Sequence, residues 1–209
     1  MDTTKIEEWF QIGVAVAAIV SGAVYGILQM KKMMERKKTQ RTEEIFNRVN
    51  MKIWEMLTEF RMKFGASRVS VIQFHNGGKF VDGTSMRRMS ISHQSCDQRV
   101  PSTTQFRQDV LISRFIEIVE ILQENDSKIR KVQSEHDSNS KKFYELNDTV
   151  YFSLLPIQCS DSLTIQGYIS VEWCDLGSLD KVVEDEYHEY FDEIRSQISY
   201  LLSTSKDYR

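Results

Sequence analysis

The sequence predicts an α+β domain with an antiparallel sheet flanked by helices, preceded by a single transmembrane helix and a helical stalk. Three observations predict this class: an uncharged apolar segment near the start of the chain, β-branched segments grouped around turn residues, and amphipathic helical patterns on either side of them. The 209 residues, 41% of them hydrophobic, suffice to bury one sizeable core. A net charge of −3 excludes a nucleic-acid binder that depends on positive charge over the whole domain.

The transmembrane helix is predicted over residues 9–30, because no charged residue occurs from Trp9 to Met30. As a helix this segment spans about 33 Å, close to the hydrocarbon thickness of a bilayer. Cations retained on the cytoplasmic side follow it, so we predict a single-pass membrane protein with its N-terminus outside and residues 31–209 in the cytoplasm. A cleaved signal peptide and a buried soluble helix are the alternatives. A basic collar follows the span, and contact with anionic lipid headgroups or a plain stop-transfer flank are its two interpretations. The collar comprises Lys31, Lys32, Arg36, Lys37, Lys38 and Arg41.

Small residues recur every four positions inside the predicted span, at Ala18, Gly22 and Gly26. Such a stripe lets two helices approach closely in lipid, so these residues form a predicted transmembrane dimer face. A helix simply surrounded by lipid is the alternative. The stalk over residues 31–44 is polar all round, as in a solvated helix or one strand of a weak coiled coil. Together these segments predict a parallel homodimer.

Charge and pattern divide the chain into four parts. Net charge is −2 over residues 1–8, +5 over 31–41 and −6 over 42–209. We therefore expect an acidic extracytoplasmic tip, an apolar span, a basic stalk and an acidic cytoplasmic domain. The predicted boundaries are 1–8, 9–30, 31–44 and 45–209.

The cytoplasmic domain begins with an apolar stripe at steps of three and four, which predicts a core-facing helix that stops at Gly65. β-branched runs and Gly-containing pairs then predict strands and turns, and a final apolar stripe predicts a closing helix. We expect the first and last helices to pack together on one face of the sheet and a middle helix to cover the other. The predicted elements are helix 45–64, strand 68–75, turn 76–78, turn 82–83, strand 86–93, helix 105–124, polar loop 123–142, strands 150–158 and 164–173, and helix 179–203.

Two segments resemble a known family. The segment Ser153-Leu-Leu-Pro-Ile157, followed by Ile165-Gln-Gly-Tyr-Ile-Ser-Val171, is similar to the strand with proline, hairpin and glycine-containing strand of GAF domains, the small-molecule sensor modules related to PAS. The resemblance covers about residues 45–203. The turn Phe74-His-Asn-Gly-Gly78, with Asp82-Gly83 and Met86 after it, resembles a membrane-tethered subgroup also found in phage genomes.

The resemblance implies a ligand pocket on the sheet face opposite the first and last helices. No residue set for cyclic-nucleotide or bilin binding is recognisable. Plain core packing is the alternative for the pocket's apolar members, and turn capping is the alternative for its first histidine. The implied ligand-binding residues are Phe74, His75, Met89, His93, Phe106 and Tyr168.

The cysteines and histidines give no pattern for a metal or a disulfide. Cys96, Cys159 and Cys174 are odd in number and widely spaced, as expected of reduced thiols. His93 and Cys96 lie three residues apart but lack the second ligand pair of a tetrahedral site. We therefore expect no metal, and no motif requires a cofactor.

These observations predict a membrane-anchored sensor or interaction module, not an enzyme, with no attached catalytic output domain. Its expected partners are the membrane, a second copy of the chain, an unidentified protein and, as the resemblance implies, a small-molecule ligand. One alternative is a thiol redox enzyme that uses Cys96, by likeness to the GAF-fold methionine sulfoxide reductases. Another is a membrane scaffold that binds no ligand.

Overall fold

The computed structural model describes residues 3–79, 81, 85–136, 138–159 and 162–206. Of the first 23 residues, only Ser21 has a described side chain, so the predicted span is described largely as backbone, and the surroundings of Ala18 and Gly22 lie outside the described part. The chain divides into two units, residues 1–47 and 48–209. Within the described residues, no helix is both long enough and apolar enough to cross a bilayer.

Helix α1 (Thr3–Lys63) accounts for the whole described part of the first unit. All six side chains of the predicted basic collar are exposed on it. A Cβ atom added at Gly26 would meet nothing within 4 Å. The last turns of α1 belong to the second unit, and the helix stops before Gly65, whose φ of 62° is the left-handed conformation that ends helices. The predicted stop is confirmed.

The second unit is built on a six-stranded sheet in the order β3-β2-β1-β6-β5-β4, antiparallel at each of its five junctions. The two central strands, β1 and β6, come from opposite ends of the domain sequence, so their pairing joins the two halves of the domain into one sheet. The predicted strands are confirmed, although most extend by a few residues. The six strands are β1 (Arg68–Lys79), β2 (Ser85–Cys96), β3 (Val110–Leu111), β4 (Arg130–Lys131), β5 (Tyr151–Cys159) and β6 (Ser162–Trp173).

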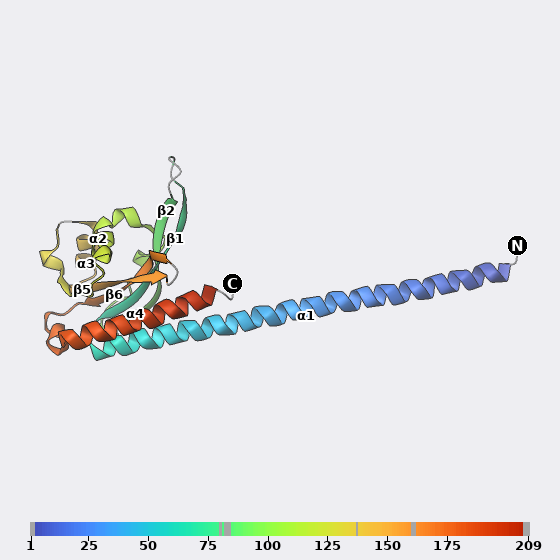
Figure 1. The fold of residues 1–209 in the computed structure, drawn as a ribbon, viewed down its shortest axis with the longest axis horizontal. Helices are drawn as coiled ribbons and strands as arrows, with labels where there is room; N and C mark the ends of the chain where they lie inside the picture. The colour runs from blue at the N-terminus through green and yellow to red at the C-terminus, as the bar shows by residue number, and fades with distance from the viewer. Residues whose placement is uncertain (1–2, 80, 82–84, 137, 160–161, 207–209) are drawn as a thin grey trace. The chain divides into compact units, whose positions relative to one another are not determined.

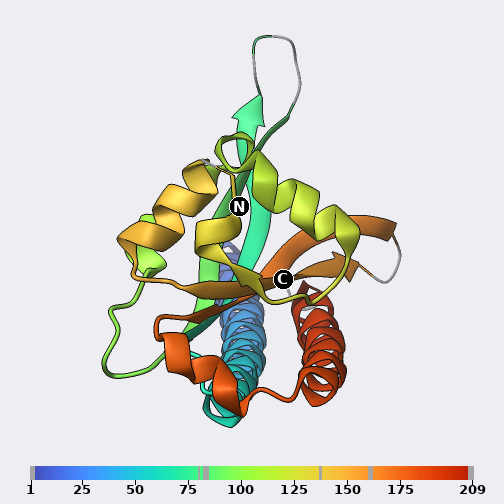
Figure 2. The same ribbon diagram turned by 90° about the vertical axis from the view of Figure 1, so that its left-hand side faces the viewer.

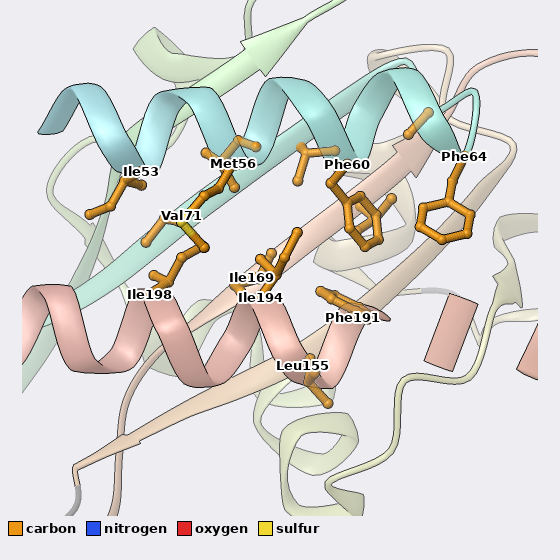
Figure 3. Packing of buried hydrophobic residues seen from close by; sticks show 14 of the residues in the cluster. Ile53, Met56, Phe60, Phe64, Val71, Leu155, Ile169, Phe191, Ile194 and Ile198 are labelled. Carbon is orange, nitrogen blue, oxygen red and sulfur yellow. The ribbon is translucent and has the colours of Figure 1, made fainter. Parts of the chain in front are cut away.

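One face of the sheet is covered by the end of α1 and by α4 (Glu184–Lys206), which lie side by side (Figures 1 and 2). Figure 3 shows the apolar side chains that fill the space between these helices and the strands. Phe60 lies at the centre of an aromatic cluster, with ring centroids 5.2 Å from Phe191 and 5.7 Å from Tyr187. The predicted pairing of the first and last helices on one face is confirmed.

The opposite face is covered by two short helices, α2 (Ile116–Glu124) and α3 (Asn139–Leu146), as Figures 1 and 2 show. A second core lies beneath them and draws on four strands as well as both helices. Its buried members are Ile72, Met89, Ile91, Ile118, Ile121, Leu122, Val132, Tyr144, Phe152, Leu154 and Tyr168.

The single helix predicted over 105–124 is wrong. The segment contains the 3-10 turns η1 (Thr104–Phe106) and η2 (Ile112–Arg114), with β3 between them, and only α2 is α-helical. Two local features explain the difference. Thr103 makes no side-chain capping bond, and Asp109 has a φ of 56°, a conformation that interrupts a right-handed helix.

The polar segment 123–142, predicted to be a loop, contains β4, the 3-10 turn η3 (Val132–Ser134) and the start of α3. Val132 is buried, and the Ser138 side chain caps α3 by accepting a hydrogen bond from the Lys141 amide. A few buried side chains and one cap therefore order a segment whose composition is almost entirely polar.

The turn predicted at Asn76-Gly77-Gly78 is also wrong, because β1 continues to Lys79. The β1–β2 register shifts between Asn76 and Lys79, and Gly78 adopts a φ of 111°. Gly77 and Gly78 therefore lie at an irregularity in the β1–β2 pairing and not in the turn that joins the two strands. The second predicted turn, Asp82-Gly83, lies outside the described residues. At the far end of the domain, the predicted helix 179–203 is present from Glu184, after the 3-10 turn η4 (Leu176–Lys181).

Candidate functional site

The sheet face beneath α2 and α3 carries buried charge. Val69 and Val71 of β1 point toward α1 and α4, so the alternating Arg68 points to the opposite face. Arg68 is fully buried and donates from Nε to Glu172 Oε2 at 2.9 Å. It also donates to the Asn147 carbonyl at 2.6 Å, and Thr149 Oγ1 bonds both Arg68 and Glu172. This is a closed ion pair whose polar atoms are satisfied.

A second arginine, Arg107, is buried on the same face with 1% of its surface exposed. Its backbone is fixed by a hydrogen bond from the Ile91 amide of β2 to its carbonyl at 2.9 Å. Its Cζ lies 3.8 Å from the ring centroid of Phe143 and 5.3 Å from that of Tyr144, so the guanidinium packs beneath α3. Its Nε and Nη2 atoms have no hydrogen-bond partner among the described residues.

Two tyrosines face this guanidinium. Among the described residues, the buried Tyr144 hydroxyl also has no hydrogen-bond partner, and the Tyr168 hydroxyl donates to the weak acceptor Met89 Sδ, at 3.6 Å. Burial raises the pKa of both tyrosines, so both are neutral at physiological pH. For Arg107, burial alone lowers the pKa, but Tyr168, Tyr144 and Glu172 more than offset it and keep the pKa above its usual value. Arg107 is therefore a buried cation.

A cavity of about 330 Å³ lies between α2, η3 and α3; Tyr144 lines it, whereas Arg107 does not. Tyr144 lines it from below, together with Phe152 of β5. Tyr144 therefore lies next to both the cavity and the Arg107 guanidinium.

The structure brings together three of the six residues that the resemblance implied for ligand binding. Phe74, Met89 and Tyr168 lie in the second core, with the Phe74 and Tyr168 rings 6.0 Å apart. His75 is exposed and bonds Ser90 Oγ at 2.9 Å. Phe106 of η1 is 57% exposed.

The sixth residue, His93, lies on the other face of the sheet. It pairs with Val71 in the β1–β2 register, and its Nε2 bonds Asn50 Oδ1 of α1 at 3.0 Å. The register shift between Val71 and Ile72 changes which β2 residues share each face, and alternation read from the sequence cannot detect it.

The position of His93 predicts a pH dependence of stability. Burial lowers the pKa of His93 in the folded chain, so the unfolded chain binds more protons near pH 6.5. The free energy of unfolding therefore decreases as the pH falls from 7.5 to 5.5. We expect His93→Gln to reduce the change in the free energy of unfolding between these pH values, measured by urea denaturation. His136→Gln, at an exposed position, is the matched control. An unchanged pH dependence in His93→Gln would contradict the expectation.

Cys96, the residue of the redox alternative, is half-buried at the end of β2. Burial raises the pKa of its thiol, and this effect outweighs the opposing charges of Arg68 and Arg61. The thiolate that nucleophilic chemistry requires is therefore disfavoured at neutral pH. Among the described residues, no group of three or more His, Cys, Asp or Glu side chains could hold a metal ion.

Sequence reasoning missed Arg107 and Tyr144. Arg107 falls within the wrongly predicted helix, and Tyr144 is the second residue after the predicted loop 123–142. Nothing in the local pattern marks an arginine for burial, because arginine is mostly exposed in proteins. The only available signal was Phe143-Tyr144, an aromatic pair close to a strongly polar segment.

The chain matches no protein-family model and no curated protein. Solved GAF structures do match it. The phycocyanobilin-bound GAF domain from a cyanobacterial phytochrome has 15% identity and a TM-score of 0.57, over 80% of this chain and 94% of that one. A far-red cyanobacteriochrome photoreceptor has 14% identity and a TM-score of 0.56, over 85% and 98%. GAF3 from Slr1393 of Synechocystis sp. PCC6803 has 11% identity and a TM-score of 0.55, over 76% and 95%. These likenesses show that the chain has the GAF fold.

Proposed function

We propose that this protein is a GAF-fold sensor module that binds a small molecule beneath α2 and α3. The observation that carries the proposal is the difference between the two faces of the sheet. Both faces bury a tyrosine hydroxyl without a partner among the described residues, Tyr187 beneath α1 and α4 and Tyr144 beneath α2 and α3, but only the second of these places a buried arginine, Arg107, with unpartnered nitrogens beside that hydroxyl. Buried polar groups of this kind are typical of binding sites. Photoreceptor domains of the same fold, one with bound phycocyanobilin, support a sensor role.

The sheet offers a physical route from the ligand to the helices. Strands β1 and β6 are central, and neighbouring residues on each strand point to opposite faces. Tyr168 lies in the core beneath α2 and α3, whereas the adjacent Ile169 packs against α1 and α4. A shift of β6 on ligand binding therefore changes the packing of both terminal helices, which transmit the signal.

The proposal includes membrane anchoring through residues 9–30 and a parallel dimer. The uncharged segment and the basic collar support the anchor. Within the part of this segment that has described side chains, large apolar residues are more than half exposed on α1, as expected of a surface covered by lipid or by a second helix. They are Val24, Tyr25, Ile27, Leu28 and Met30.

The binding proposal is tested by methyl NMR of the full chain in detergent, with labelled Ile and Met side chains. Fractionated small-molecule extracts are added, and we expect shifts at Met89, Ile118 and Ile121 that exceed those at Met62, which is exposed on α1. If no fraction shifts the methyl signals beneath α2 and α3, the sensor proposal is wrong and the ligand-free scaffold is favoured.

A further inference from the structure

The described core has an unbalanced charge. Among the described residues, its buried Arg, Lys, Asp and Glu side chains are Arg68, Arg107 and Glu172. Glu172 is committed to Arg68 by the 2.9 Å ion pair and to Thr149 by a 3.0 Å hydrogen bond. One buried positive charge, that of Arg107, is left without a bonded anion. Such a charge is costly unless something neutralises it.

The two unpartnered nitrogens of Arg107 lie on one edge of the guanidinium. Nη1 lies on the same side as Cδ, so the N–H bonds of Nε and Nη2 point in the same direction, side by side. This edge matches the two oxygens of a carboxylate or phosphate group and binds them through two parallel hydrogen bonds. Among the described residues, no carboxylate occupies it.

Tyr144 adds a third donor at the same place. Its ring lies 5.3 Å from Arg107 Cζ, its hydroxyl is buried without a partner among the described residues, and it is neutral and able to donate. An anion bridging Arg107 and Tyr144 would satisfy all three groups at once.

We propose that the ligand of this module carries a small oxyanion, a carboxylate or a phosphate group, held side-on by Nε and Nη2 of Arg107 and by the Tyr144 hydroxyl. The proposal rests on the sensor function above and adds the chemical class of the ligand. Because Arg107 is 1% exposed, the bound anion is enclosed, and its entry and exit require local opening of the surrounding segment.

The test is a thermal-shift titration of the full chain in detergent, with sodium phosphate and sodium acetate as separate probes at constant ionic strength set by chloride. We expect a saturable rise in midpoint temperature with at least one probe. Phosphate alone indicates a phosphate-bearing ligand, and acetate alone indicates a carboxylate. If neither probe gives a saturable rise, the proposal is wrong.

Variants locate the site. Arg107→Met should weaken probe binding at least about 100-fold. Arg107→Lys keeps the positive charge but loses the two parallel N–H donors, so it should weaken binding about 10-fold or more. Tyr144→Phe should weaken it about 10-fold. Tyr187→Phe is the matched control, because its buried hydroxyl also lacks a partner among the described residues but lies on the other face, and it should bind normally. Undiminished binding in Arg107→Met would overturn the proposal.

Arg107→Met should also remain folded. Removing an uncompensated buried charge while keeping the apolar stem should leave the probe-free midpoint temperature unchanged or raise it. A fall of more than about 5 °C would show that Arg107 is a structural residue and would contradict the proposal. If NMR finds a neutral ligand beneath α2 and α3 that also binds Arg107→Met, the proposed sensor function is supported and the oxyanion proposal is wrong.

Discussion

Replacing Arg68 with methionine is expected to lower the free energy of unfolding by about 3–5 kcal/mol, because removing one partner of a buried ion pair leaves the other charge uncompensated. Glu172 would lose the 2.9 Å bond from Arg68 and remain 1% exposed. The carbonyl of Asn147 would lose its 2.6 Å hydrogen bond from Arg68 as well. Urea denaturation of the full chain, followed by far-UV circular dichroism, measures the effect.

The double variant Arg68→Met/Glu172→Leu is the control for this prediction. Removing both charges takes away the uncompensated carboxylate, so the double variant should lose less stability than Arg68→Met alone. A loss below about 1 kcal/mol in Arg68→Met would contradict our description of the pair. The comparison with Arg107→Met is informative, since the two arginines are equally buried and differ in their partners.

Replacing Phe60 with alanine is expected to cost about 3–5 kcal/mol of unfolding free energy. Phe60 is fully buried, and its ring centroid lies within 6 Å of four others: those of Phe64, Tyr187, Tyr190 and Phe191. Truncation leaves a cavity between α1 and α4 that neighbouring rings cannot fill without leaving their rotamers. The same denaturation experiment measures the loss.

Met62→Ala is the matched control, because Met62 lies on the same helix and is 70% exposed. It should change the free energy of unfolding by no more than about 0.5 kcal/mol. If Phe60→Ala were as mild as Met62→Ala, α1 would not pack on the sheet as described.

The parts of the fold with strong local periodicity could be predicted from the sequence. The stripe from Ile53 to Phe64 and the alternation of Ile169, Val171 and Trp173 directly reflect burial on one face. The segments that failed lack such periodicity. Segment 104–115 is shaped by the left-handed Asp109 and by short 3-10 turns, and segment 123–142 by a few buried side chains among many polar ones.

The candidate site was only partly predictable, for a different reason. Tyr168, Met89 and Phe74 were implied by the resemblance to GAF domains, and the structure places them together in the core beneath α2 and α3. Arg107 and Tyr144 come from segments 37 residues apart and meet only through tertiary packing. An arginine with free donors is unfavourable for folding, and we propose that it serves binding, so rules that relate sequence to stability do not predict it.

The central claim, that the face beneath α2 and α3 binds an anionic small molecule at Arg107, is tested most directly by native mass spectrometry. The full chain and Arg107→Met would be purified from the same cells and released from detergent micelles in the instrument. We predict an added small-molecule mass on the unmodified chain that is absent from Arg107→Met. The same mass on both proteins, or no added mass on either one even after incubation with phosphate and acetate, would contradict the claim.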